Sequence, residues 1–210
     1  MVKTEKEVKF DRYNSVMRAV ARWASFFKEN PHRFAEIFLN IKLKEFQKIN
    51  LYEMFHNTHF MYVASRGQGK TWTTAVYCVI KCILFPGTKI CIASGSKKQA
   101  LEVISTIQDN LLKEFSWGSD NLNNEIAFIS TNINSARCDF KNGSWIKTVT
   151  ATDTARGNHC TVLVLDEFRM ISEDVLSKVL TKFLTIKRHP GYLNNPKYAS
   201  LAEENMEIYL

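Results

Sequence analysis

The stretch HFMYVASRGQGKTWTTAVYCVIKCILF, residues 59–85, joins two patterns of hydrophobicity through a glycine-rich turn. The apolar run at 59–64 predicts a buried β-strand, and residues 69–85 predict a helix that ends near Pro86 and Gly87. A strand, a tight turn and a helix in this order direct backbone N–H groups at the positive end of the helix, where anions bind. The stretch therefore predicts a phosphate-binding loop.

Within this loop, glycines let the backbone wrap phosphate oxygens, Lys70 can reach the β and γ phosphates, and the Thr71 hydroxyl can ligate Mg²⁺. The full signature has a glycine five residues before Gly69, where this chain has Ala64, a residue still small enough for a tight turn. The alternative is an ordinary glycine-rich turn with an exposed lysine. The predicted nucleotide-contacting residues of the loop are Ser65, Arg66, Gly67, Gln68, Gly69, Lys70, Thr71 and Trp72.

A second signal lies in TVLVLDEF, residues 161–168. A continuous apolar run that ends in a carboxylate puts Asp166 at the carboxyl end of a buried strand, where open α/β sheets bind ligands. Asp166 can hold Mg²⁺ there, and Glu167 can act as the general base toward a water in line with the γ phosphate. The alternative is a solvated acidic pair at a strand end. Together the two motifs predict ATP binding and hydrolysis, with Mg²⁺.

Strand and helix patterns alternate along most of the chain and predict an α/β fold, a P-loop NTPase of the ASCE/RecA-like kind. Its central sheet is expected to be mostly parallel, with helices on both sides. We expect a helical N-terminal segment over 1–57, which carries an adenine-binding motif, and an ATPase core over 58–210. The predicted helices are 11–28, 31–39, 44–56, 69–85, 96–115 and 172–183; the predicted strands are 59–64, 89–94, three short runs within 125–149 with a hairpin at Asn142-Gly143, 161–167, and one starting at 206.

Two apolar stripes belong to the helical N-terminal segment. Val16, Val20, Trp23 and Phe27 recur at helical spacing in the first helix. In the helix over 44–56, Phe46, Ile49 and Met54 fall near one side, and we expect this stripe to pack in the core.

The net charge of +7 is concentrated in the first three quarters of the chain, so a polyanionic partner such as nucleic acid is permitted. Ordinary solvated surface explains such an excess equally well. The five cysteines form no CxxC pair and are expected to be reduced and mostly buried, with no zinc site. The N-terminus lacks the pattern of a secretory signal, and no apolar run is long enough to span a membrane. A cytosolic protein is expected.

Four segments, ASRGQGKT, LVLDEF, TARGNH and LKEFQ, together resemble the ATPase domain of the large terminase subunit of tailed bacteriophages, over residues 41–183. The resemblance implies a DNA-packaging motor in the cytoplasm of the host cell. In such a motor a homo-oligomeric ring docks on the portal of an empty capsid and uses ATP to drive double-stranded DNA inward. The implied partners are double-stranded DNA, the portal protein and the small terminase subunit.

The resemblance also assigns roles to three residues. Gln47 of LKEFQ would contact the adenine, although it is equally well read as a polar residue on a helix surface. Arg66 would sense or stabilise the γ phosphate; the alternative is a solvent-facing charge beside the site. Arg156 of TARGNH would act as an arginine finger on the nucleotide of a neighbouring subunit, or else simply pair with an acid.

Two features of the family are not found in this sequence. One is the Ser/Thr-rich coupling motif, which in the family follows the helix after the DEF residues, and the other is the metal-dependent nuclease domain. We therefore expect an ATPase-domain fragment or a separately encoded piece, without nuclease activity. One alternative function is a superfamily 2 helicase-like DNA-dependent ATPase, although such proteins usually have DEAD or DEAH where this chain has DEFR. Another is a nucleotide-gated assembly module without significant turnover.

Overall fold

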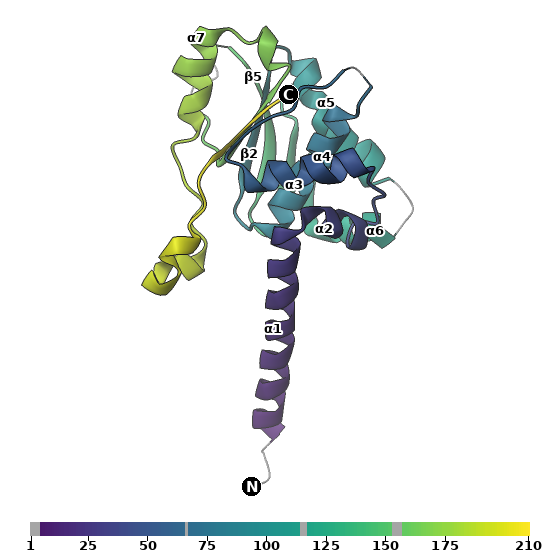
Figure 1. Cartoon of the computed structure of the whole chain (residues 1–210), viewed down its shortest axis with the longest axis vertical. Helices are drawn as coiled ribbons and strands as arrows, with labels where there is room; N and C mark the ends of the chain where they lie inside the picture. Colours follow the sequence, from purple (N-terminus) through teal and green to yellow (C-terminus); the bar gives the residue numbers. More distant parts are fainter. Residues whose placement is uncertain (1–4, 66, 114–116, 153–156) are drawn as a thin grey trace.

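The computed structural model describes residues 5–65, 67–113, 117–152 and 157–210. Within them, seven strands form one sheet in the order β1-β7-β6-β2-β5-β4-β3 (Figure 1). The first five of these strands in sheet order run parallel, and β3, β4 and β5 form an antiparallel meander. The strands are β1 (His59–Met61), β2 (Lys89–Ser94), β3 (Ile126–Ser130), β4 (Arg137–Phe140), β5 (Trp145–Thr150), β6 (Val162–Asp166) and β7 (Met206–Tyr209).

Helices cover both faces of this sheet, which confirms the predicted α/β class. α4 and the helices that follow β2 and precede β1 pack on one face, and the helical segment after β6 packs on the other (Figure 1). The helices are α1 (Glu5–Glu29), α2 (Pro31–Ile37), α3 (Glu45–His56), α4 (Lys70–Leu84), α5 (Lys97–Thr106), α6 (Trp117–Glu125) and α7 (Glu173–Val175). Shorter π and 3₁₀ segments are η1 (Ile107–Leu111), η2 (Phe168–Met170), η3 (Leu176–Leu180), η4 (Thr181–Phe183), η5 (Gly191–Asn194) and η6 (Pro196–Leu201).

Strand β6 shows why the sheet needs both layers. All five of its residues are buried. Val162 and Val164 pack in the core with α4, whereas Leu163 and Leu165 face the opposite core beneath α7 and η3, because successive side chains of a strand point to opposite faces. The continuous apolar run is thus explained by burial on two sides, as predicted.

Strand β1 departs from the prediction of a buried strand. It is three residues long and lies at the edge of the sheet; His59 and Met61 are exposed and Phe60 is half-buried. Its run of apolar residues continues into Tyr62, which is buried beyond the end of the strand. An edge strand has a neighbour on only one side, and this accounts for the lower burial.

The predicted core stripe of α3 is only partly correct. Met54 is fully buried between α3 and the rest of the core, together with Leu51 and Phe55. Phe46 and Ile49, however, lie on the exposed side of the helix. The buried face of α3 is set by Leu51, Met54 and Phe55, at i, i+3 and i+4, and the other two residues fall outside it.

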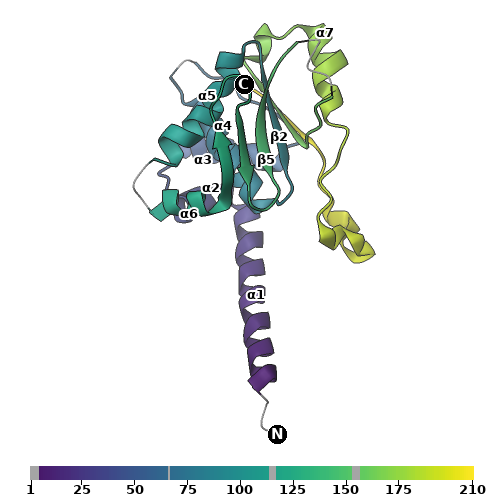
Figure 2. The ribbon, with the colours of Figure 1, turned by 180° about the vertical axis from the view of Figure 1, so that it is seen from behind.

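Helix α1 projects from the body of the molecule as a single rod (Figures 1 and 2). Its C-terminal end is anchored by Phe27, whose ring meets that of Phe34 edge-to-face at a centroid distance of 5.2 Å. Val16, Val20 and Trp23 are all more than half exposed. The apolar spacing therefore predicted the helix correctly, but among the described residues only the last member of the stripe, Phe27, packs against the core.

The helix predicted over 96–115 continues as α5 and η1 to Leu111, and a helix that the sequence did not predict, α6, follows at Trp117. Gly118 explains the position of α6. A Cβ there would lie 1.9 Å from the Leu39 carbonyl oxygen, so the helix can approach the end of α2 only because this residue is glycine.

The five cysteines are free and buried, as expected. Among the described helices, none is both long and apolar enough to cross a bilayer.

A buried charged cluster ties the segment before β7 to the C-terminal half of α4. Lys81, only 5% exposed, lies 3.7 Å from a Glu203 carboxylate oxygen, and its Nζ sits 3.9 Å from the centroid of the Phe85 ring. Arg188 is also buried, pairs with Glu203 and donates a hydrogen bond to the Pro86 carbonyl at 3.2 Å. Burial lowers the pKa of Lys81 to about 8, against the opposing effect of the Glu203 carboxylate.

Replacing this lysine by methionine (Lys81→Met) is expected to stabilise the protein at pH 7 by about 1 to 3 kcal/mol, because the desolvation of the charged amine outweighs its ion pair. Between pH 8 and the unfolded pKa of about 10.4, unfolded Lys81 binds more protons than folded Lys81, so this residue makes stability rise with pH. The advantage of the variant should therefore shrink over that window. Chemical denaturation across pH measures it.

An exposed lysine provides the control: Lys178→Met, which removes a surface ion pair with Asp174, should change the unfolding free energy by less than about 1 kcal/mol at every pH. If Lys81→Met were less stable than the parent at pH 7, with a difference independent of pH, the cluster would be a net stabilising ion pair.

Candidate functional site

The glycine loop, which contains Gly67 and Gly69, lies between the end of β1 at Met61 and the start of α4 at Lys70. Gly67 and Gly69 have positive φ angles of 80° and 72°, a conformation that glycine adopts without strain, and Gly69 is the residue on which α4 begins. Lys70 is the first residue of the helix and Thr71 the second. The loop backbone thus leads into the positive end of a helix of 15 residues, as predicted.

At the carboxyl end of β6, Asp166 is 8% exposed and lies in register with Ser94 of β2. Burial, followed by the nearby Glu167 and Glu102 carboxylates, raises the pKa of Asp166, and the positive charge of Lys70 opposes this rise. Lys70 and Asp166 therefore lie close enough to interact, although 96 positions separate them in the chain. The two motifs meet at one edge of the sheet.

Glu167 has a φ angle of 50° in the left-handed region, which is unusual for a residue other than glycine. The side chain is about one-third exposed, and its carboxylate lies 3.5 Å from Nε of Arg169. Strained backbone of this kind is often found at functional sites. It turns the chain sharply between β6 and η2 and leaves Glu167 at the mouth of a cavity.

This cavity has a volume of about 450 Å³ and brings the two motifs together. Lys70 lines it from the start of α4, and Glu167 and Arg169 line it from the turn after β6. The remaining lining residues are Tyr62, Val63, Ala64, Ser65, Phe168 and Leu210.

Strand β7 is what brings β1 and β6 into position, since it lies between them and runs parallel to both. The backbone N–H of Tyr62 donates to the Tyr209 carbonyl at 2.8 Å, and that of Phe168 donates to the Leu210 carbonyl at 3.3 Å. Sequence reasoning did not assign Tyr62, Arg169 or Leu210 to the site. In the sequence, Arg169 was marked by its position two residues after Glu167 in DEFR, and no signal pointed to Leu210.

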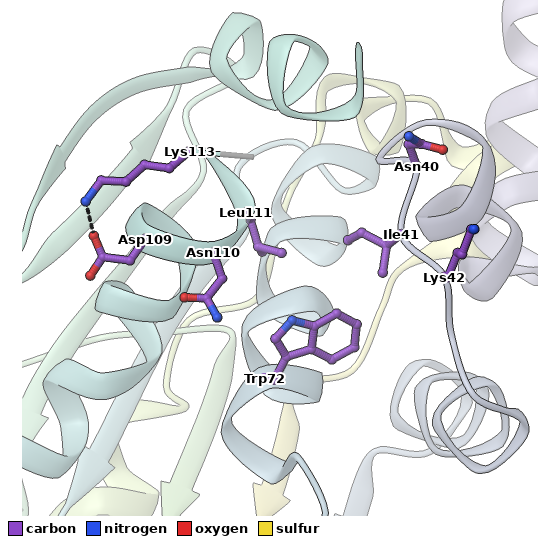
Figure 3. Close-up of a pocket in the computed structure, with 8 residues that line it drawn as sticks. All are labelled: Asn40, Ile41, Lys42, Trp72, Asp109, Asn110, Leu111 and Lys113. Carbon is purple, nitrogen blue, oxygen red and sulfur yellow. Dashed lines mark hydrogen bonds and ion pairs between the residues drawn. The ribbon is translucent and has the colours of Figure 1, made fainter. Parts of the chain in front are cut away.

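A second cavity, of about 780 Å³, opens beside the first turn of α4 (Figure 3). Trp72 and Ile41 form its apolar wall, and Lys42 lies on the segment that leads into α3. Asp109 and Lys113 form an ion pair across from them. Asn40, Asn110 and Leu111 complete the lining.

Gln47 of α3 lies against the glycine loop. Its Nε2 is 3.6 Å from the position that a Cβ on Gly69 would occupy, and its Oε1 accepts a hydrogen bond of 2.9 Å from the Lys44 N–H. The side chain is therefore fixed at the start of α3 with its amide nitrogen directed at the loop. Of the other predicted residues, Ser65 and Gln68 are exposed, and Arg66 and Arg156 lie outside the described residues.

The sequence from residue 61 to residue 206 matches the family described as "Terminase large subunit, T4likevirus-type, N-terminal". The chain belongs to this terminase family. The match covers more than two thirds of the chain and includes both motifs that meet at the candidate site. No curated protein sequence matches the chain.

Two solved structures resemble this terminase chain in fold. The large terminase ATPase domain of Thermus phage P74-26 is 15% identical, with a TM-score of 0.54 over 84% of this chain and 68% of that one. The large terminase of bacteriophage HK97 is 16% identical, with a TM-score of 0.58 over 87% of this chain and 36% of that one. At these identities the likeness shows the fold, which is a P-loop NTPase fold. The chain spans about a third of the length of the HK97 protein.

Proposed function

We propose that the chain binds and hydrolyses ATP with Mg²⁺ and that this reaction drives double-stranded viral DNA into a procapsid. The observation that carries the proposal is the shared cavity lined by Lys70 and Glu167, beside Asp166, at the carboxyl edge of the parallel sheet. Ligands of open α/β sheets bind at that edge. Membership of the terminase large-subunit family supports the packaging role.

The residues of the loop fit a triphosphate. Backbone N–H groups at 67–71 lie at the N-terminal end of the long helix α4, and Lys70 supplies a positive charge to pair with the negative charge of the phosphates. The γ phosphate is assigned to the cavity that Glu167 lines. The adenine ring is assigned to the side of the loop where Gln47 and Trp72 lie. The apolar wall formed by Trp72 and Ile41 suits the aromatic ring of adenine, and the Gln47 amide can form hydrogen bonds with the polar edge of that ring.

The residues also fit a magnesium ion. Thr71 offers a hydroxyl and Asp166 a carboxylate, and hard cations such as Mg²⁺ prefer oxygen ligands. The buried position and raised pKa of Asp166 are consistent with a carboxylate whose charge is better balanced when a cation is bound. When bound, the ion would supply positive charge that offsets the negative charge of the phosphates.

Glu167 is assigned as the general base that takes a proton from the attacking water. Its carboxylate is paired with Arg169 at 3.5 Å, and one of its oxygens must be free to accept the proton. A carboxylate has lone pairs enough to do both. Arg66 is proposed to stabilise the γ phosphate, and Arg156 to act on the nucleotide of a neighbouring subunit in a ring, on the basis of sequence alone.

The implied partners follow from the family: double-stranded DNA, the portal protein and the small terminase subunit, in the cytoplasm of the host cell. The family match favours this reading over a superfamily 2 helicase. A nucleotide-gated assembly module is the second candidate. This candidate is favoured by the ion pair between Glu167 and Arg169. A carboxylate held by an arginine is less free to take a proton from water, which suits a protein that binds ATP without hydrolysing it.

Phosphate release from ATP, measured over a protein concentration series with and without duplex DNA, tests the proposal. A motor that acts as a ring should show turnover per chain that rises with concentration and rises again with duplex DNA. A passive binder should show nucleotide binding but no phosphate release under any of these conditions, and that result would overturn the proposed hydrolysis.

A further inference from the structure

Helix α1 carries an apolar stripe that the nucleotide site does not use. Residues 10, 13, 17, 20, 24 and 27 are apolar and alternate in spacing between three and four, the repeat of a two-stranded coiled coil. Phe10 is 65% exposed and Tyr13 61% exposed. Val16 and Trp23 widen the stripe on one side and are also more than half exposed.

Between residues 10 and 27 the charged residues of α1 stand away from this stripe, and Lys9 and Lys28 flank its two ends at positions g and e. If Phe10 takes position a of the heptad, then Arg12, Arg18 and Arg22 occupy positions c, b and f on the outer face. The flanking e and g positions between residues 13 and 27 are Asn14, Val16, Ala21 and Trp23, which carry no charge. A second helix can therefore lie along the stripe without placing like charges opposite one another.

The exposed apolar area of α1 is large enough to form an interface. Six large apolar side chains each leave roughly 100 Å² in contact with water, so two such helices would bury on the order of 1,200 Å² in total. That total is at the lower end of stable protein–protein interfaces, and the roughly 600 Å² on one helix is at the upper end of the apolar patches that monomers expose. The six side chains are Phe10, Tyr13, Val16, Met17, Val20 and Trp23.

We propose that α1 pairs with α1 of a second copy of this chain in an antiparallel coiled coil. The stripe is symmetric about its midpoint: in an antiparallel pair, residue 10 falls opposite residue 27, residue 13 opposite 24, and residue 17 opposite 20 of the second copy. Tyr13 then packs against Ala24, the one small residue of the stripe. A layer of one large and one small residue fills space without overpacking.

A parallel pair fits less well. It would set Tyr13 against Tyr13 and Ala24 against Ala24, which crowds one layer and leaves a void in another. It would also bring two globular bodies to the same end of the pair, because the body follows directly from Phe27, which packs on Phe34 (Figure 2). The antiparallel arrangement puts the bodies at opposite ends.

Sedimentation of the full chain over a concentration series tests the pairing. The parent should form a dimer without nucleotide, and Met17→Lys should weaken self-association at least tenfold, since it buries a charge in the central layer. Ser15→Lys adds the same charge two residues away on the outer face and should leave the dimer intact. These readouts do not depend on ATP, so the pairing and the proposed hydrolysis can fail separately.

Cross-linking tests the orientation, because the native cysteines are buried. A mixture of Tyr13→Cys and Ala24→Cys chains should form a disulfide-linked heterodimer under mild oxidation, whereas Ala24→Cys alone should not link to itself. Self-linking of Ala24→Cys would overturn the antiparallel arrangement. A parent that stays monomeric would overturn the pairing altogether, and monomers that bind anionic phospholipid vesicles would assign the stripe to a membrane surface instead.

Discussion

Replacing the proposed base by its amide (Glu167→Gln) is expected to leave Mg-ATP binding near that of the parent and to slow phosphate release by about a hundredfold to ten-thousandfold. A general base contributes that much to proton transfer, and glutamine keeps the size of the side chain but cannot accept the proton. The left-handed backbone at residue 167 is retained, so the site geometry should persist. Single-turnover phosphate release and binding of a fluorescent ATP analogue measure the two effects separately.

The matched control is Glu204→Gln, which makes the same change in an exposed ion pair with Lys187, at the other end of the sheet. It should release phosphate at the parent rate. If Glu167→Gln also turned over at the parent rate, Glu167 would not be the base. If Glu167→Gln lost nucleotide binding instead, the Glu167 carboxylate would be needed to bind the metal ion or to hold the loop, and not to take a proton from water.

Removal of the loop lysine (Lys70→Ala) is expected to weaken Mg-ATP binding by about ten- to a hundredfold. Hydrogen bonds between charged groups contribute about 1.5–3 kcal/mol, and Lys70 is the cation that lines the cavity from the start of α4. The change should also raise the pKa of Asp166 further, because Lys70 is the cation that opposes the rise. Mg-dependent binding by the variant should therefore be lost at a higher pH than in the parent as the pH is lowered.

Lys178→Ala, in an exposed ion pair on the segment after β6, serves as the control and should bind Mg-ATP like the parent. Thermal unfolding should confirm that Lys70→Ala is folded. Nucleotide affinity unchanged by the loss of Lys70, in a folded variant, would contradict the assignment of residues 67–71 to the triphosphate.

Strand β6 and helix α4 could be predicted from sequence because their burial is nearly complete. β6 is apolar throughout since both of its faces are covered, and α4 has an unbroken buried run from Thr73 to Cys82. The hairpin at Asn142-Gly143 was equally predictable, because Gly143 has the positive φ angle of 83° that a tight turn requires.

Strand order could not be predicted in the same way. The run before the glycine loop was predicted to be buried, yet β1 is an edge strand. Among the described residues it pairs with β7 alone, almost 150 residues later in the chain. Whether an apolar run is central or peripheral depends on which distant strand pairs with it. Local pattern carries no information on that pairing.

Tertiary contacts also explain why α6 was not predicted and why the buried face of α3 was predicted incorrectly. The sequence of α6, WGSDNLNNE, is rich in residues that favour turns, and the helix is held by the close approach of Gly118 to the end of α2. In α3, Phe46 and Ile49 have helical spacing with Met54 but fall outside the face that the core uses.

At the candidate site, the order of the two motifs was enough to predict that Lys70 and Asp166 lie near each other, because both belong to elements whose ends lie at the same sheet edge. It did not reveal the pairing of Glu167 with Arg169, or the contact of Phe168 with the Leu210 carbonyl. Those contacts depend on the left-handed turn after β6, which was not predicted, and on the position of β7 between β1 and β6. The sequence predicted the strand that begins at residue 206, but not its place in the sheet.

A crystal structure of the chain with a slowly hydrolysed ATP analogue and Mn²⁺ in place of Mg²⁺, located by anomalous scattering, would test the nucleotide site most directly. We expect a triphosphate over residues 67–71 in contact with Lys70, and a manganese peak between Thr71 and Asp166. A triphosphate bound elsewhere, or a metal peak remote from Asp166, would contradict this assignment.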